Sequence, residues 1–254
     1  MNGMLDVSGL GHTYGSGDKA HTAVGEVSFT VEPGELVCIV GPSGCGKSTL
    51  LRCVAGLLEP SKGSVSLHGN AVSGVPDDLA VVFQDYSRSL LPWRTVAGNV
   101  EFPLRDRGLS KAQRRDRVAE ALSWVGLSKA AGKHPWQLSG GMQQRVCIAR
   151  ALAYRPALML MDEPFASVDA QTRADLEDLV LKVREEADMT VLLVTHDIDE
   201  SVYLADRVLV LSGSPSTVVE TLKVDLPGPR DQITTRGSET FVRLRTEVAQ
   251  LIRH

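Results

Sequence analysis

Short apolar runs recur along the chain and alternate with stretches that have the spacing of amphipathic helices. Each run is short enough to be a buried strand and is bounded by turn or charged residues. This alternation is typical of a mainly parallel sheet whose strands are joined by crossover helices, and it predicts an α/β fold. The strands are expected at Leu36 to Val40, Leu79 to Phe83, Ala157 to Met161, Val191 to Thr195 and Val208 to Leu211.

The pattern changes between Gln84 and about Tyr154, where helices and loops replace the strands. Ser110 with Gln113 has the sequence signature of a capping box, which begins a helix. We therefore expect a helical subdomain inserted into the sheet domain. Apolar residues of its best-defined helix recur on one face, at Val118, Ala119, Leu122 and Val125.

The chain beyond Gly213 holds a β-like stretch, a turn at Pro227 to Pro229 and a last helix predicted over Glu239 to Ile252. Because no internal repeat is visible, we interpret residues 1–254 as one domain. Its expected parts are a catalytic core (1–84 and 155–212), the helical subdomain (85–154) and a C-terminal extension (213–254).

The composition is that of an ordinary soluble globular protein, with 43% hydrophobic residues and a mean hydropathy of -0.02. No apolar run approaches the roughly eighteen residues that cross a bilayer, and the first residues lack a secretory pattern, so the cytosol is the expected location. The net charge of -4 argues against a general nucleic-acid binder. The four cysteines show no metal or pairing spacing, and reduced, buried thiols are expected at Cys38, Cys45, Cys53 and Cys147.

The clearest chemical motif is GPSGCGKST, which fits the pattern G-x-x-x-x-G-K-[ST]. In such a loop, glycines let backbone N–H groups close around phosphates, Lys47 reaches the β and γ oxygens, and the Ser48 hydroxyl can bind Mg²⁺. A predicted strand precedes the loop and a predicted helix, Lys47 to Leu57, follows it, as the motif requires. The residues expected to bind the nucleotide are Gly41, Pro42, Ser43, Gly44, Cys45, Gly46, Lys47, Ser48 and Thr49.

An acidic pair follows the apolar run in LMLMDE. Asp162 is expected to hold Mg²⁺, directly or through water, and Glu163 to orient or deprotonate the attacking water. By itself, an acidic pair after a strand is more often a solvated loop. Because this pair comes after a phosphate loop, we interpret it as the second half of a hydrolytic site.

His196 and Gln84 also follow apolar strands, and both are expected at the carboxyl edge of the sheet, where ligands gather. The imidazole of His196 can hydrogen-bond the γ-phosphate oxygen and the water that it faces. The amide of Gln84 can reach Mg²⁺ or that water. Taken alone, a histidine at such a position is more often structural, and a lone Gln84 is no more indicative of a site than of a structural role.

The segment LSGGMQQR, Leu138 to Arg145, predicts a second phosphate-binding element. A serine followed by two glycines and a helix-forming run indicates a helix whose first backbone amides are free, and such a terminus attracts phosphate. One nucleotide does not obviously need two phosphate-binding elements, so the segment requires a separate explanation.

Together these motifs resemble the ATP-binding subunit of ABC transporters over nearly the whole chain. They occur in the family's order: GPSGCGKST, VVFQ, LSGGMQQR, LMLMDEP, SVDA at Ser167 to Ala170, and VTHD. The resemblance implies a P-loop NTPase core with an antiparallel β portion near the N-terminus, and ATP hydrolysis with Mg²⁺. It identifies Gln84 as the Q-loop residue, Asp169 as the D-loop aspartate and His196 as the switch histidine. It also assigns adenine stacking to Tyr14, although the sequence YGSG is equally that of a simple turn.

The resemblance also explains the second phosphate-binding element. In ABC ATPases two chains pack head to tail, so the signature of one chain caps the nucleotide held by the phosphate loop of the other. Ser139, Gly140 and Gly141 are therefore expected to act in trans on a second copy of this chain. Nucleotide closes this dimer, and hydrolysis with phosphate release reopens it.

A finer resemblance, to the nitrate, sulfonate and taurine importer group, is carried by LLPWRTVAGNV, DEPFASVDAQTR, THDIDESVYLADRV and LPGPR. It implies transmembrane permease subunits as partners, a solute-binding protein as an indirect partner, and a peripheral position on the cytoplasmic face of the membrane. Trp93 and Arg94 lie where a coupling helix docks in this family, although Trp93 could equally be packed in the helical subdomain. The subunit does not touch the solute, so no residue identifies it.

The chain departs from the family at Val168, where leucine is more usual, and we expect dimer contact to survive with altered coupling. One rival interpretation is a soluble ABC ATPase that acts on nucleic acid or ribosomes. Such relatives usually have two fused ATPase domains or a long coiled coil, which this sequence lacks. Another is a scaffold that binds ATP without turnover, which the presence of Glu163 and His196 disfavours.

Overall fold

The computed structural model describes residues 3–253 and, among these, every side chain except that of Ser87. The described residues form one sheet of ten strands. In spatial order these are β5 (Asn70–Ala71), β4 (Lys62–Leu67), β1 (Leu5–Tyr14), β2 (His21–Val31), β10 (Ser216–Lys223), β9 (Arg207–Leu211), β3 (Leu36–Val40), β8 (Thr190–Val194), β7 (Leu158–Asp162) and β6 (Leu79–Val82).

The five strands from β9 to β6 are parallel, whereas β5, β4, β1 and β2 pair in antiparallel fashion. The predicted α/β class, with a mainly parallel sheet and an antiparallel portion near the N-terminus, is therefore confirmed. Six strand limits differ from prediction by one residue. Phe83 lies outside β6, β7 begins and ends one residue later than predicted, β8 begins and ends one residue earlier, and β9 begins one residue earlier.

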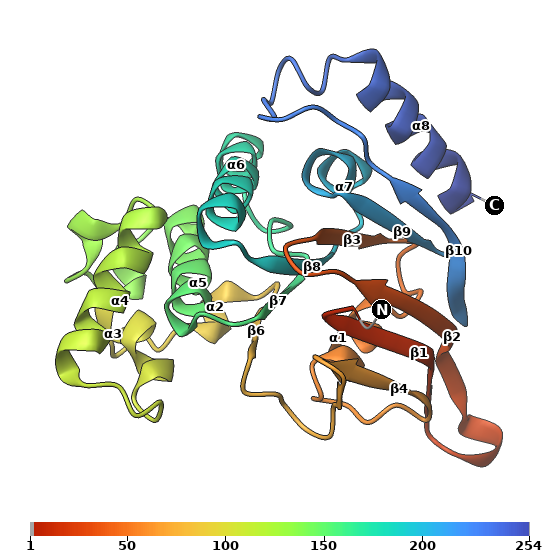
Figure 1. Ribbon diagram of the computed structural model, residues 1–254, viewed down its shortest axis with the longest axis horizontal. Coiled ribbons are helices and arrows are strands. Elements are labelled where there is room, and N and C mark those ends of the chain that lie inside the picture. Colours follow the sequence, from red (N-terminus) through yellow and green to blue (C-terminus); the bar gives the residue numbers. More distant parts are fainter. Residues whose placement is uncertain (1–2, 254) are drawn as a thin grey trace.

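Helices cover both faces of the parallel strands. They are α1 (Lys47–Val54), α2 (Tyr86–Ser89), α3 (Val96–Glu101), α4 (Lys111–Trp124), α5 (Gly140–Tyr154), α6 (Ala170–Ala187), α7 (Ile198–Leu204) and α8 (Glu239–Arg253), with short 3-10 turns η1 (Gly17–Lys19), η2 (Phe102–Leu104), η3 (Ser128–Ala130) and η4 (Pro135–Gln137). Figure 1 shows α3, α4 and α5 grouped beside β6 and β7, with α8 at the opposite side of the molecule next to α7.

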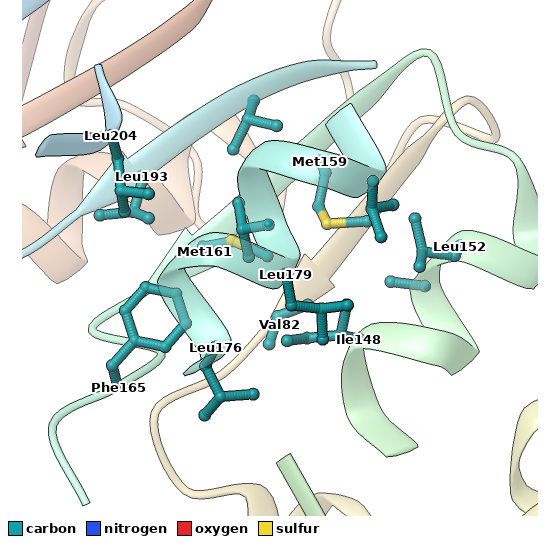
Figure 2. Close-up of a cluster of buried hydrophobic side chains, with 14 of the residues drawn as sticks. Val82, Ile148, Leu152, Met159, Met161, Phe165, Leu176, Leu179, Leu193 and Leu204 are labelled. Atoms are coloured by element: carbon teal, nitrogen blue, oxygen red, sulfur yellow. The ribbon is translucent and has the colours of Figure 1, made fainter. Parts of the chain in front are cut away.

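The parallel strands are buried on both faces, which explains their uninterrupted apolar sequences. In β3, Leu36, Cys38 and Val40 face one core, and Val37 and Ile39 face the other, as the two-residue period of a strand requires. The larger core lies between the sheet and α5, α6 and α7, and Figure 2 shows part of it around Met159, Phe165 and Leu176. The smaller core joins the sheet to α1 and the antiparallel strands.

Two details of the predicted helices are wrong. The helix expected over Lys47 to Leu57 ends at Val54, because Gly56 has a left-handed φ of 68° and a Cβ there would lie 1.9 Å from the carbonyl oxygen of Gly74. In α4, Ala119 is exposed and Ala121 is buried instead, since position 121 is one turn from the buried positions 118 and 125. The capping box of Ser110 and Gln113 is confirmed.

The chain after β9 does not leave the sheet at once. β10 pairs with β9 on one side and with β2 on the other, so the expected C-terminal extension, which starts at residue 213, includes a strand of the sheet. We propose that the extension begins after Lys223 and call residues 224–253 the C-terminal segment. The last helix extends over Glu239–Arg253, one residue beyond the predicted end.

Candidate site for nucleotide binding and hydrolysis

Four parallel strands bring their carboxyl ends to one edge of the sheet. The phosphate loop follows β3, Gln84 lies just beyond β6, Asp162 ends β7 next to Glu163, and His196 lies just beyond β8. Ligands of open α/β sheets bind at this edge. The sheet therefore brings together candidate residues that are far apart in the sequence.

The phosphate loop connects β3 to α1. Gly46 precedes the helix with a φ of 101°, and a Cβ there would lie 2.6 Å from the carbonyl oxygen of Ala23, so only glycine fits. The buried side chain of Lys47 donates from Nζ to the carbonyl oxygens of Gly41 at 2.8 Å and Pro42 at 3.0 Å. The loop and its lysine thus form one unit, held together from within.

An open cavity of about 520 Å³ lies over this loop. The first turn of α1 borders the cavity, and its free backbone amides and helix dipole favour an anion there. Of the nine predicted loop residues, Gly41, Pro42 and Cys45 lie outside the lining. The lining residues are Tyr14, His21, Ala23, Ser43, Gly44, Gly46, Lys47, Ser48, Thr49, Glu163 and His196.

Two lining residues, His21 and Ala23, are absent from the sequence-based prediction. Both belong to β2, and His21 is the cross-strand partner of Tyr14 in the antiparallel pair of β1 and β2. The turn residues YGSGDKA indicate a hairpin in the sequence. They do not determine its register, so the pairing of His21 with Tyr14 could not be predicted.

Tyr14 lies at the end of β1 with 40% of its surface exposed. Its hydroxyl oxygen is 3.1 Å from Oγ1 of Thr49, and its ring contacts the ring of His12 edge-on, with the centroids 4.5 Å apart. These contacts fix the ring at the cavity wall while a large part of it stays accessible. A planar ligand could therefore stack on it.

Ser48 and Asp162 are in direct contact, since Oγ of Ser48 donates to Oδ1 of Asp162 at 3.0 Å. Burial raises the pKa of Asp162, and the hydrogen bond from Ser48 acts in the opposite direction. A hydroxyl and a partly buried carboxylate are hard oxygen ligands, so this pair fits Mg²⁺, which usually takes one or two carboxylates and completes its shell with phosphate and water. No group of three or more His, Cys, Asp or Glu side chains placed to hold a metal occurs in residues 3–253.

The three predicted catalytic side chains meet at one oxygen. Oε2 of Glu163 accepts a hydrogen bond from Nε2 of Gln84 at 3.3 Å and lies 3.0 Å from Nδ1 of His196. The Glu163 side chain is 20% exposed and that of His196 58%. The amide of Gln84 thus contacts Glu163 rather than Ser48 or Asp162, and its expected role as a metal ligand stays a prediction.

The backbone of Glu163 is itself unusual. Its φ of 44° is in the left-handed region, which costs a residue other than glycine about 1–3 kcal/mol. The N–H of Glu163 donates to the carbonyl oxygen of Val194 at 2.8 Å, and its own carbonyl accepts from Ala166. Neighbouring β8 therefore holds this conformation, which directs the carboxylate toward Gln84 and His196.

The signature segment begins α5, as predicted. The Ser139 side chain caps this helix by accepting a hydrogen bond from the N–H of Met142 at 3.4 Å. None of Ser139, Gly140 and Gly141 lines the cavity over the chain's own phosphate loop. The signature therefore has no part in that cavity.

The two signature glycines also have a packing role that the sequence did not reveal. A Cβ at Gly140 would lie 2.5 Å from the hydroxyl of Tyr86, and a Cβ at Gly141 would lie 2.2 Å from Cγ2 of Thr172. The start of α5 is thus packed tightly against α2 and the first turn of α6. A side chain at either position would have to displace the side chain of Tyr86 or Thr172.

The predicted D-loop residue, Asp169, lies outside the cavity and caps α6. Its carboxylate accepts hydrogen bonds from the backbone N–H of Thr172 at 3.0 Å and from Oγ1 of Thr172 at 2.7 Å. These bonds lower the pKa of Asp169. The neighbouring Val168 is half-buried and packs on the larger core, so the smaller side chain is accommodated within the chain.

A larger cavity, about 920 Å³, lies between α6 and the C-terminal segment. It contains no residue of the phosphate loop, and its lining mixes acidic and basic side chains such as Arg184 and Asp206. We therefore assign the nucleotide to the smaller cavity. All four cysteines are free and buried, as predicted.

A parallel sheet with a phosphate loop, an acidic pair and polar side chains converging at one edge defines a P-loop nucleoside triphosphatase. A family model described as "ABC transporter" matches residues 24–166, more than half of the chain. The chain belongs to the ABC transporter family, and within it to the ATP-hydrolysing subunits. The resemblance drawn from the motifs is thereby confirmed.

The relatives are similar over most of this chain. The nitrate import ATP-binding protein NrtC of Synechococcus elongatus is 43% identical over 93% of the chain, which spans only 36% of the length of NrtC. The taurine import ATP-binding protein TauB of Yersinia pestis is 47% identical over 87% of the chain and 85% of TauB. The dimeric post-hydrolysis structure of the ATP-binding cassette MJ0796, bound to ADP and Pi, matches with a TM-score of 0.75 at 35% identity, over 87% of this chain and 99% of that one.

Proposed function

We propose that this chain hydrolyses ATP to energise an importer of a small oxyanion or organic solute such as nitrate, a sulfonate or taurine. The proposal is supported by the similarity to relatives named as nitrate and taurine import ATP-binding proteins. The observation that carries the enzymatic part is the carboxylate of Glu163, held by Gln84 and His196 beside the phosphate loop. The rival function on nucleic acid or ribosomes has no comparable support.

In this proposal the phosphate loop and Lys47 bind the phosphates of ATP, and Tyr14 stacks on the adenine, with His21 beside it. Glu163 accepts a proton from the attacking water, because its carboxylate lines the cavity over the phosphate loop, whereas Asp162 is hydrogen-bonded to Ser48. His196 and Gln84 orient that carboxylate and the water. Positioning and electrostatics provide most of the rate in phosphoryl transfer, so the fixed side chains suffice for this chemistry.

Ser48 and Asp162 would hold Mg²⁺, which when bound neutralises charge on the phosphate oxygens. The hydrogen bond between these two residues keeps the carboxylate turned toward the hydroxyl, so both oxygens face the same place. Binding of the ion also offsets the raised pKa of Asp162, since a cation favours the ionised carboxylate.

Ser139, Gly140 and Gly141 would act on the nucleotide of a second copy, and Asp169 would lie near the same interface. Two observations support this arrangement. Ser139 is exposed, Gly140 and Gly141 are half-buried, and none of the three lines the chain's own cavity. The similar cassette that is bound to ADP and Pi is described as dimeric.

The partners in the membrane would be separate permease subunits, with the chain bound at the cytoplasmic face. None of the helices in residues 3–253 is both long and apolar enough to cross a bilayer. The docking surface we propose is the region after Gln84, where Trp93 is 73% exposed and the guanidinium of Arg94 lies over the ring of Phe102 at 5.1 Å. An exposed tryptophan beside an anchored arginine is suited to a partner helix.

The test is solute uptake in a strain that lacks this chain. Accumulation of labelled nitrate, taurine and an alkanesulfonate should fall for one of these solutes, and the wild-type chain should restore it. The Glu163→Gln chain, present in equal amount, should not restore uptake. Unchanged uptake of the whole panel in the deletion strain would refute the importer assignment and leave the ATPase assignment standing.

A further inference from the structure

The C-terminal segment is joined to the ATPase core by three arginines, each paired with a carboxylate of the core. Arg236 pairs with Glu177 of α6 at 2.5 Å. Arg245 pairs with Asp199 of α7 at 3.7 Å, and Arg230 lies 3.9 Å from Asp206, just before β9. α8 also packs against α7 and β9, as Figure 1 shows.

The pair of Arg236 and Glu177 is the most buried of the three. Glu177 is 1% exposed, and its Oε2 also accepts a hydrogen bond from Nε2 of Gln232 at 3.0 Å. The guanidinium of Arg236 lies over the ring of Tyr203 at 4.8 Å, where the aromatic face adds attraction for the cation. A carboxylate so far from water depends on these partners, because an unpaired buried charge is strongly destabilising.

Glu177 is one of three neighbouring carboxylates, and one of the other two is adjacent to His196 in the sequence. The second is Asp197, which follows His196, caps α7 and pairs with Arg173 at 2.9 Å. The third is Glu200, which is 4% exposed. We call Glu177, Asp197 and Glu200 the acidic cluster.

The three carboxylates are close enough to influence one another. Burial raises the pKa of Glu200, and the charges of Asp197 and Glu177 raise it further, while a hydrogen bond with Thr195 lowers it. Asp197 raises the pKa of Glu177 in the same way, against the opposing charge of Arg236. The acidic cluster is therefore balanced mainly by two arginines, one from α6 and one from the C-terminal segment.

His196 is flanked in the sequence by Asp197, a member of the acidic cluster, and by Thr195, which hydrogen-bonds to Asp197 and Glu200. Thr195 lies in front of the histidine, is 2% exposed and accepts a hydrogen bond through Oγ1 from the N–H of Asp197 at 3.0 Å. Asp197 lies behind it. A shift of Asp197 or Thr195 would move the imidazole away from its 3.0 Å contact with Glu163.

We infer that Arg236 and Gln232 of the C-terminal segment are positioning residues for ATP hydrolysis. Arg236 balances the charge of Glu177, Gln232 donates a hydrogen bond to it, and together they keep the acidic cluster and the loop of His196 in place. This inference rests on the proposed role of His196 in hydrolysis. It gives the C-terminal segment an active part in the reaction cycle. A partner that pulled this segment away would slow hydrolysis without touching the nucleotide.

The test compares steady-state hydrolysis of Mg-ATP by the purified full-length chain and its variants. Arg236→Met should lower kcat about five- to tenfold with the KM for ATP unchanged, because the phosphate loop is not affected. Adding Glu177→Gln to this variant should restore at least half of the lost kcat, since the neutral amide needs no cation. Arg243→Met is the matched control on α8, because Arg243 is exposed and, among residues 3–253, forms an ion pair only with Glu247, one turn away.

Gln232→Met removes a neutral donor from Glu177, leaves the ion pair intact and should lower kcat about two- to threefold. If the melting curve of Arg236→Met shows that this variant does not fold, Gln232→Met is used for the test in its place. The inference is overturned if every folded variant has a kcat within the error of the wild type, or if Glu177→Gln fails to restore kcat. The kcat of His196→Ala is measured alongside. A wild-type kcat for His196→Ala would refute the proposed role of the histidine. A reduced kcat for His196→Ala together with a wild-type kcat for Arg236→Met would refute only the inference about the C-terminal segment.

Discussion

At the residue scale, the function depends on how Glu163 is held. The carboxylate meets Gln84 and His196, its backbone is in a strained left-handed conformation, and the N–H of Glu163 is bound to β8. Each of these features restricts the side chain to one position beside the phosphate loop. Strain that the surroundings maintain is common at active sites, where a fixed position matters more than stability.

Replacing Glu163 by Gln should separate ATP binding from hydrolysis. The amide keeps the size of the side chain but does not accept a proton, so the hydrolysis rate should fall by about 10²–10⁴ while nucleotide binding is retained. An ATP-bound dimer should then be visible by gel filtration. The control is Glu186→Gln on α6, because Glu186, within the described part of the chain, forms an ion pair only with Lys182 on the surface. Hydrolysis by Glu163→Gln at the wild-type rate would show that Glu163 does not have the proposed role.

At the scale of elements, α7 is unusual because it carries a buried acid, Glu200. It is short, follows the switch histidine directly, and buries the carboxyl group of Glu200, whose Oε1 atom has no hydrogen-bond partner among the described residues. The charged side chains that face Glu200 from neighbouring elements are Glu177, Asp197 and Arg173. α7 therefore carries a buried acid whose surroundings disfavour its ionised form.

Glu200→Gln should change how stability depends on pH. Burial holds the pKa of Glu200 well above its usual value in the folded state, so the folded chain binds the proton more tightly than the unfolded chain does. The resulting stability is present at low pH and is lost as pH rises from the unfolded pKa toward the folded one. The Tm of Glu200→Gln should therefore match the wild type near pH 4, below the unfolded pKa, and exceed it by a few degrees near pH 8.

The measurement is a series of thermal melts by circular dichroism at constant ionic strength. Glu239→Gln, at the exposed start of α8, is the control and should follow the wild-type curve throughout. A constant difference in Tm between Glu200→Gln and the wild type across this pH range would show that Glu200 is ionised in the folded state.

At the scale of the whole molecule, the main consequence is that the signature lies outside the nucleotide cavity of its own chain. Ser139 caps α5, and both glycines are packed against α2 and α6, so the helix start is rigid before any partner arrives. A rigid element costs little entropy to bind. This arrangement suits a dimer in which each copy completes the site of the other.

A mixed dimer tests that arrangement. Ser139→Arg and Lys47→Ala chains should each be nearly inactive alone. Mixed in equal amounts, they should recover roughly a quarter of the wild-type rate, because half of the dimers formed at random are mixed and each keeps one of its two sites. If the signature acted within its own chain, every site would carry a defect, and the mixture would be no more active than its parents.

The sequence by itself determined the α/β class, the phosphate loop, the acidic pair and the family, because these are local patterns: apolar runs, a glycine spacing and a motif order that survive without any knowledge of contacts. It also predicted a catalytic role for Gln84, Glu163 and His196. It did not predict that these three share one carboxylate oxygen, since that depends on which strands lie side by side.

Only the tertiary structure placed His21 opposite Tyr14, because a strand register is fixed by pairing and not by the residues of one strand. Only it showed that Gly140 and Gly141 lie against the side chains of Tyr86 and Thr172, and that Arg236 of the C-terminal segment pairs with Glu177. The physical reason is the same throughout. Short-range patterns depend only on residues that are neighbours in the sequence. Burial, charge balance and close contacts between atoms depend on segments that meet only when the chain folds.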